Sequence, residues 1–272
     1  MKKGIVLPAL LLILGTQTYA QKKWAETAKG SHTIVQNKGG QTLGYSPKSG
    51  VKIIQVDGLA FKDLNKNGKL DIYEDWRKPV AERAKDLATK MTVEQMAGLM
   101  LYSRHQAVPA PEAGMFTGTY NGKPFSASGV KPSDLSDQQI AFLTKDNLRH
   151  VLMTSVVSPI VAAEWNNNIQ ALVEGIGVGI PANNSSDPRN GANKDAEYNA
   201  GSGGSISQWP EELGLSATFD PSSTEQFGAI AGKEYRALGI ATALSPQIEL
   251  ATEPRWHRFV GTCGEDPKLA PD

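Results

Sequence analysis

The sequence has 272 residues, of which 40% are hydrophobic and 21% charged, and its 28 basic and 28 acidic residues cancel to a formal net charge of zero. No global field therefore favours a nucleic acid or an anionic membrane, and a neutral substrate fits at least as well as a charged one. Cys263 is the only cysteine, which excludes an intramolecular disulfide and a thiolate cage around a metal. The length suffices for one large α/β domain or two small domains.

Residues 1–20 have the composition of a secretory signal peptide. Lys2 and Lys3 give a basic start, residues 5–14 form a short apolar run, and Ala20 closes a stretch that a signal peptidase can cleave. A membrane anchor is the alternative, but the apolar run is shorter than the ~20 residues that cross a bilayer. We therefore expect a secreted or periplasmic protein without a membrane span.

Residues 21–76 are expected to form an N-terminal extension with one strand, over residues 51–56, and a calcium-binding loop. Residues 63–74 fit the twelve-residue EF-hand loop, because oxygen-bearing side chains occupy its ligand positions and Gly68 stands at position six, where the chain turns sharply. A turn rich in Asn, Asp and Gly that holds no metal is the alternative. The expected ligands of a structural Ca²⁺ are Asp63, Asn65, Asn67, the backbone carbonyl of Lys69, Asp71 and Glu74.

Helical periodicity runs from residue 78 to residue 100 and predicts two helices, the second capped by Thr92 with Gln95 closing a capping box. Residues 103–137 are rich in Pro, Gly and Ser, which is typical of a long loop. The remaining expected elements are a strand at 151–157, a helix at 162–174, a strand opening at 179–181, a polar loop at 183–208, a helix at 222–238 begun by Ser222 or Ser223, and a strand at 240–244.

The order of these elements after residue 150 is strand, helix, strand, loop, helix, strand, which is typical of parallel β/α units. We therefore predict an α/β fold class for residues 77–272. Three strands are too few for a closed eight-stranded barrel, which takes about 250 residues.

Three separated segments carry motifs in a fixed order. The first is residues 84–95, Ala-Lys-Asp-Leu-Ala-Thr-Lys-Met-Thr-Val-Glu-Gln, and the second is Gly179-Ile180-Pro181, six residues before Asp187. The third begins at Trp209-Pro210 and includes Glu234-Tyr235-Arg236-Ala237-Leu238-Gly239, Pro254-Arg255-Trp256-His257-Arg258 and Gly264-Glu265-Asp266-Pro267. In order and spacing, these segments resemble glycoside hydrolase family 3 of the β-glucosidase type.

The resemblance implies a partial (β/α)8 TIM barrel over residues 77–272 and two substrate-binding residues. Asp187 falls where the family places a carboxylate that holds sugar hydroxyls by charge-assisted hydrogen bonds; the alternative is that it caps a turn before Pro188. Arg258 matches an arginine that helps bind the same sugar through its fixed fork of donors; the alternative is a structural salt bridge. His257 replaces the family's glycine, which leaves the substrate preference open.

The resemblance also implies an exo-acting, retaining hydrolase that releases terminal β-D-glucose from a β-glucoside or oligosaccharide, with no cofactor in the chemistry. Retention needs a nucleophilic carboxylate and an acid/base carboxyl about 5 Å apart, and the family's motifs for both follow the Gly-Glu-Asp-Pro motif. We therefore assign no catalytic residue within the 272 residues and expect the chain alone to be inactive. The alternatives are a β-xylosidase, a β-N-acetylhexosaminidase, and a non-catalytic, calcium-stabilised carbohydrate-binding module.

Overall fold

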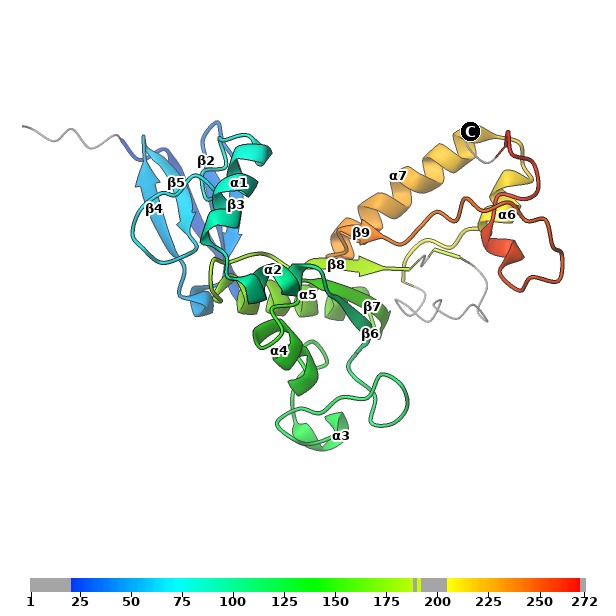
Figure 1. Cartoon of the computed structure of the whole chain (residues 1–272), viewed down its shortest axis with the longest axis horizontal. Coiled ribbons are helices and arrows are strands. Elements are labelled where there is room, and N and C mark those ends of the chain that lie inside the picture. The colour runs from blue at the N-terminus through cyan, green and yellow to red at the C-terminus, as the bar shows by residue number, and fades with distance from the viewer. Residues whose placement is uncertain (1–20, 188–189, 192–204, 270–272) are drawn as a thin grey trace, which may run out of the picture.

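The structure is a computed structural model that describes residues 21–187, 190–191 and 205–269. The chain has three parts (Figure 1): an N-terminal antiparallel β region, a central parallel sheet with helices, and a C-terminal arm of one long helix and extended chain. The signal peptide predicted for residues 1–20 lies outside the described residues. Within the described ranges, none of the helices combines the length and the apolar character that crossing a membrane requires.

The N-terminal part contains five strands in two antiparallel sheets, β1-β2-β3 and β4-β5. The strand expected at residues 51–56 is confirmed as β4, but the sequence pattern does not predict the other four. β1 shows why: it is almost wholly exposed and has no apolar face, so that hairpin pairing with β2 sets its register instead. The elements are β1 (Trp24–Lys29), β2 (His32–Asn37), β3 (Thr42–Tyr45), the 3-10 turn η1 (Pro47–Ser49), β4 (Lys52–Val56) and β5 (Leu59–Asp63).

Two helices lead from this region to the sheet, α1 (Val80–Lys90) and α2 (Val93–Leu99), as the periodicity predicts. The capping box is confirmed, since the amide of Gln95 donates to Thr92 Oγ1 at 3.2 Å and the amide of Thr92 donates to Gln95 Oε1 at 3.0 Å. These bonds satisfy amides that the start of a helix leaves without an intrahelical partner, so α2 begins at this point.

The central sheet has four parallel strands in the order β6-β7-β8-β9, which confirms the α/β class with a parallel sheet. The loop predicted over residues 103–137 is wrong in part, because β6, α3 and the start of α4 lie there. β6 mixes Arg104, His105 and Gln106 with apolar residues and shows no clear alternation, so that pairing with β7 decides its conformation. The elements are β6 (Tyr102–Val108), α3 (Phe125–Ser128), α4 (Asp137–Thr144), β7 (His150–Val156), α5 (Pro159–Glu174), β8 (Asn183–Ser186), α6 (Glu212–Ser216), α7 (Pro221–Leu238), β9 (Thr242–Ala243) and the 3-10 turn η2 (Phe259–Gly261).

β8 is a polar strand, and the sequence pattern misplaces it. The strand expected to open at residues 179–181 begins instead at Asn183, where a loop was predicted. Its polar side chains are buried but bonded, as Ser186 shows by donating from Oγ to the carbonyl of Met153 at 2.8 Å. Because such bonds offset the cost of burying polar groups, a polar run can occupy a central strand. β9 is likewise shorter than the predicted 240–244.

The core lies between the sheet and the inner faces of α5 and α7. Trp165, Ile169 and Val173 of α5 are buried in one cluster with Val151 and Met153 of β7. Full burial of each such apolar side chain contributes roughly 1.5–3 kcal/mol. This cluster supports the sheet edge on which the candidate site lies.

α7 starts at a different cap from the one predicted. Asp220 is the N-cap and accepts from the amide of Ser222 at 3.1 Å, whereas the sequence pattern favoured Ser222 or Ser223. Pro221 takes the first helical position, where its missing amide costs nothing and its φ suits a helix. A carboxylate at this end also interacts favourably with the helix dipole, which explains the preference for Asp220.

Candidate functional site

The carboxyl ends of the parallel strands position the first candidate residue. β8 and β9 run in register with Ser186 beside Ala243, and the amide of Leu244 donates to the carbonyl of Ser186 at 2.9 Å. Asp187 therefore follows β8 at the same edge from which the chain leaves β9. In open parallel α/β sheets and in barrels, this edge is where ligands bind.

Asp187 is half-buried, and α7 holds its backbone. The hydroxyl of Tyr235, a buried residue of α7, donates to the backbone carbonyl of Asp187 at 3.0 Å. This bond engages the backbone of Asp187 and not its carboxylate.

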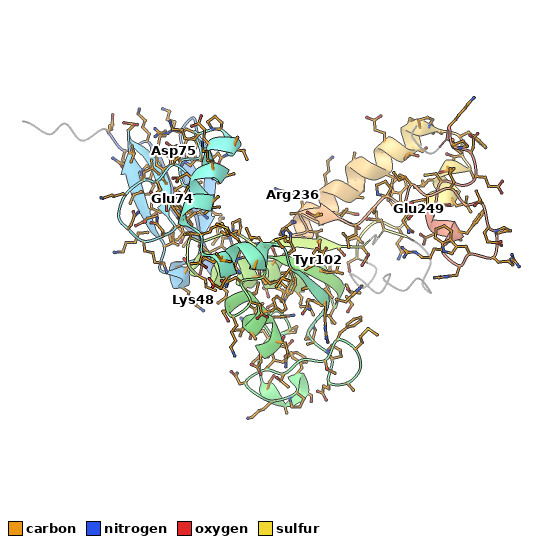
Figure 2. All side chains as sticks on the ribbon, viewed as in Figure 1. Lys48, Glu74, Asp75, Tyr102, Arg236 and Glu249 are labelled. Carbon is orange, nitrogen blue, oxygen red and sulfur yellow. The ribbon has the colours of Figure 1, made fainter. Side chains whose placement is uncertain are left out.

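Arg258 is exposed and borders an open hollow in the C-terminal arm. Leu244 lines the same hollow and connects it to the sheet edge beside Asp187. Figure 2 shows Glu249 of this hollow in the arm and Glu74 in the N-terminal part, on opposite sides of the central sheet. Contact of Asp187 and Arg258 with one sugar stays a prediction. The lining residues are Leu244, Pro246, Gln247, Ile248, Glu249 and Arg258.

A group of three interacting carboxylates, Glu211, Glu212 and Glu249, is a feature that the sequence pattern did not single out. Burial, and then the charges of Glu211 and Glu249, raise the pKa of Glu212 to about 7, although a hydrogen bond from the amide of Gln247 at 3.3 Å acts to lower it. A carboxyl with this pKa can give or take a proton near neutral pH. The only sequence signal is an acidic pair after Pro210, which the first turn of any helix can carry.

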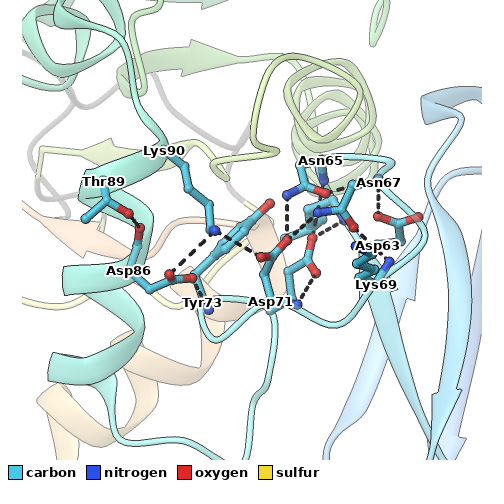
Figure 3. Close-up of polar contacts among 11 residues, drawn as sticks. Asp63, Asn65, Asn67, Lys69, Asp71, Tyr73, Asp86, Thr89 and Lys90 are labelled. Carbon is cyan, nitrogen blue, oxygen red and sulfur yellow. Dashed lines mark hydrogen bonds and ion pairs between the residues drawn. The ribbon is translucent and has the colours of Figure 1, made fainter.

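The loop at residues 63–74 is closed by bonds from its own backbone amides (Figure 3). Asp63 is almost fully buried, and its two carboxylate oxygens accept from the amides of Asn67 and Gly68, each at 3.0 Å. Gly68 has a φ of 76°, a left-handed conformation that glycine adopts without strain, which confirms the sharp turn expected at position six.

Glu74 closes the other end of the loop. Its Oε1 accepts from the amide of Leu64 at 2.7 Å and its Oε2 from the amide of Asp71 at 3.0 Å. Burial raises the pKa of Glu74, and the bonds from these amides offset part of that rise. The loop at residues 63–74 thus contains two buried carboxylates, Asp63 and Glu74.

Asp71 is engaged by three side chains (Figure 3). Asn65 Nδ2 and Asn67 Nδ2 each donate to Asp71 Oδ2 at 2.7 Å, and Lys90 Nζ of α1 lies 2.9 Å from Asp71 Oδ1. Burial alone would raise the pKa of Asp71, but the hydrogen bonds from Lys90 and the two asparagines together lower it. Lys69 lies in the same turn, with its amide donating to Asn67 Oδ1 at 2.7 Å.

The donor set fits calcium in its chemistry, because six hard oxygen donors lie within one twelve-residue turn. In the structure, Asp71 pairs with Lys90, and the Oδ1 atoms of Asn65 and Asn67 accept from backbone amides of the loop. Among the residues that the structure describes, no group of three or more His, Cys, Asp or Glu side chains is arranged to hold a metal. The loop therefore carries residue types that suit calcium, whereas its carboxylates are engaged by hydrogen bonds and by Lys90.

Comparison with known proteins identifies the family of the chain. Residues 120–272, more than half of the chain, match the glycosyl hydrolase family 3 N terminal domain. The chain belongs to glycosyl hydrolase family 3. The family 3 match begins at Tyr120, so β6 and the loop at residues 63–74 lie ahead of it. This family match confirms the resemblance to glycoside hydrolase family 3 that the sequence motifs indicate.

Two curated relatives show how much of a family 3 protein the chain represents. The periplasmic beta-glucosidase/beta-xylosidase of Dickeya chrysanthemi is 43% identical over 221 residues, covering 81% of this chain and 31% of the relative. The probable beta-glucosidase C of Aspergillus oryzae is 34% identical over 208 residues, covering 75% of this chain and 30% of the relative. The chain spans about a third of the length of these relatives.

Proposed function

We propose that this family 3 chain provides the sugar-binding part of an exo-acting, retaining β-glucosidase-type hydrolase that releases terminal β-D-glucose. The observation that carries the proposal is the position of Asp187, half-buried directly after β8 at the carboxyl edge of a parallel sheet. The names of the relatives, β-glucosidase and β-glucosidase/β-xylosidase, support a β-glycoside as the substrate class. The net charge of zero suits an uncharged sugar.

In this proposal Asp187 and Arg258 bind and orient the sugar and do not break the glycosidic bond. A carboxylate accepts charge-assisted hydrogen bonds from two neighbouring hydroxyls, and a guanidinium offers parallel donors. Retaining hydrolysis also needs a nucleophilic carboxylate and an acid/base carboxyl about 5 Å apart. We assign neither role to a residue of this chain, and we expect the 272 residues to bind sugar without hydrolysing it.

Calorimetric titration of the purified chain with methyl β-D-glucoside tests this proposal. We expect binding that Asp187→Asn weakens at least tenfold, because the neutral amide accepts weaker hydrogen bonds from the sugar. The matched control is Asp146→Asn, an exposed residue ahead of β7 at the opposite edge of the sheet, which should leave the affinity unchanged. An aryl β-glucoside should not be hydrolysed. Binding that ignores Asp187→Asn, or turnover that the same variant abolishes, contradicts the proposal.

β-Xyloside recognition is the second candidate, because the Dickeya chrysanthemi relative carries both names. Xylose differs from glucose by lacking the hydroxymethyl group on C5. Titration with methyl β-D-xyloside under the same conditions therefore separates the two. Tighter binding of the glucoside supports the first candidate, and tighter binding of the xyloside replaces it with the second.

We also propose that the loop at residues 63–74 binds one structural Ca²⁺. Two buried carboxylates on a single sharp turn, Asp63 and Glu74, support this. The ion takes no part in the sugar chemistry and would join the ends of the loop. Addition of CaCl2 to metal-free protein should release or absorb heat and raise Tm. Glu74→Gln should abolish both effects, the exposed Glu82→Gln in α1 should not, and a wild-type chain without either effect contradicts the proposal.

We propose export from the cytoplasm because of the composition of residues 1–20 and because the Dickeya chrysanthemi relative is named a periplasmic enzyme. After expression of the full sequence in a bacterial host, N-terminal sequencing of periplasmic or secreted protein should read from Gln21. Protein that stays in the cytoplasm and starts at Met1 contradicts this proposal.

A further inference from the structure

Glu234 of α7 joins two segments that are distant from it in the chain. Asn190 Nδ2 donates to Glu234 Oε2 at 2.6 Å, the amide of Ser207 donates to Glu234 Oε1 at 2.8 Å, and Ser207 Oγ donates to Glu234 Oε2 at 2.8 Å. We call this set, Glu234, Asn190 and Ser207, the Glu234 clasp. One carboxylate thus accepts three hydrogen bonds, which are stronger than neutral ones because the acceptor is charged.

A second layer of contacts supports the Glu234 clasp. The amide of Trp209 donates to the carbonyl of Asn190 at 2.6 Å, and Trp209 Nε1 donates to Ser207 Oγ at 3.0 Å. The ring of Trp209 lies 5.5 Å from that of Phe227, which is also on α7. Both segments are therefore held on the helix by polar and by apolar contacts.

The next residue of the helix continues this arrangement to the candidate site. Tyr235 donates its hydroxyl to the carbonyl of Asp187, and its ring is buried in the core beside Leu238. Consecutive residues of α7 therefore hold the chain at Asp187 and at Asn190. Anchoring on a packed helix fixes a side chain more narrowly than a free loop does, and this lowers the entropy lost when ligand binds.

We propose that Glu234 and Tyr235 are positioning residues, which fix the backbone at Asp187 and Asn190 so that the carboxylate of Asp187 meets the sugar. The inference rests on the proposed function, since it concerns the residue that we expect to bind glucoside. Neither residue touches the sugar in this account. Both act through Asp187, and this distinguishes them from residues that only stabilise the fold.

Two variants with little change in shape test the inference by titration with methyl β-D-glucoside. Glu234→Gln replaces one acceptor oxygen by a donor that faces Asn190 or Ser207, and should weaken binding at least tenfold. Tyr235→Phe removes only the hydroxyl and should weaken binding severalfold. The matched control is Glu225→Gln, an exposed residue of the same helix, which should leave the affinity unchanged. Unchanged affinity in both test variants overturns the inference.

A double variant separates positioning from general stability. If Glu234 acts through Asp187, then Glu234→Gln added to Asp187→Ala should cause no further loss of affinity, because coupled residues are not additive. A further tenfold loss in the double variant overturns the inference, since it shows that Glu234 affects the site independently of Asp187.

Amide hydrogen exchange without sugar gives a readout that does not depend on the proposed function. In Glu234→Gln the amides of Ser207 and Trp209 should exchange at least tenfold faster, while the amide of Ile169 in α5 keeps its rate. If the amides of Ser207 and Trp209 exchange at the same rates in Glu234→Gln as in the wild-type chain, the inference is overturned. If the wild-type chain binds no glucoside, the proposed function fails, and these rates still decide whether Glu234 holds the two segments.

Discussion

The loop at residues 63–74 and the sheet edge at Asp187 are held by contacts of different range along the chain. In the loop, Asp63 and Glu74 accept hydrogen bonds from amides at most ten residues away in the chain. At the edge, Asp187 is held by Tyr235, 48 residues further on, and Asn190 by Glu234, 44 residues further on. The loop needs only a local turn, whereas the edge needs the sheet and α7 in place. Damage to the core should therefore abolish the sugar site before it alters the loop.

The largest expected effect comes from the core beneath the edge. Trp165 is 1% exposed and donates from Nε1 to Gln139 Oε1 at 3.1 Å. Trp165→Ala should lower the free energy of unfolding by roughly 3–5 kcal/mol, because it leaves a cavity and an acceptor without its donor. In a urea titration of this variant, glucoside binding should disappear at a lower urea concentration than calcium binding does. Trp165→Phe, which fills most of the cavity, should lose less stability. Loss of glucoside and calcium binding at the same urea concentration would contradict the expected order.

Removal of calcium should produce the next largest effect, on the loop alone. A free ion at 100 times its Kd stabilises the folded state by about 2.7 kcal/mol, so a chelator should lower Tm. The affinity for methyl β-D-glucoside should stay the same, because the loop and the edge are held by separate contacts. Calorimetry in calcium and in chelator measures both quantities. A glucoside affinity that falls with the calcium would show that the two regions are coupled.

Glu174 connects the end of α5 to the N-terminal β region and gives a smaller effect. Its Oε1 lies 2.6 Å from Lys62 Nζ of β5, and its Oε2 accepts from the amide of Ser46 at 3.1 Å. Glu174→Gln should cost roughly 1–2 kcal/mol of unfolding free energy, since Lys62 keeps some contact with solvent. Thermal unfolding measures this loss. The control is a double-mutant cycle with Lys62→Met. If the double variant loses as much stability as the two single variants together, the ion pair itself contributes nothing.

The last expected effect is a pH dependence at the arm, which solvent screening of the half-buried Glu212 reduces. The pKa of Glu212 rises from its ordinary value of 4.5 to about 7 in the fold, chiefly by burial. Between these pKa values the unfolded chain gives up this proton first, so the stability falls as the pH rises. Glu212→Gln should remove that fall and raise Tm at about pH 8 more than at about pH 5. Tm measured at both pH values checks this, with Glu225→Gln as the control; an equal change at both would contradict it.

Sequence patterns were sufficient where the interactions are short in range. The capping box of Thr92 and Gln95 joins residues three apart, and the turn at Gly68 depends on a single residue type at one position. The order of the family motifs also needs no structure. Patterns failed at β8, whose Asn and Ser residues resemble a loop until the bonds of Ser186 to β7 are known. They also missed Glu212, because its burial, which chiefly raises its pKa, arises only on folding.

By itself, the sequence determined the family, the parallel α/β class and the calcium-loop pattern, because each depends on residue types at fixed spacings. The family resemblance already placed Asp187 at the end of a strand, and only the tertiary structure decided that Tyr235 and Glu234 hold its surroundings. The physical reason is distance along the chain. A contact between residues more than forty positions apart forms only when packing of the core offsets the entropy lost in bringing the two segments together. No local sequence pattern indicates that packing.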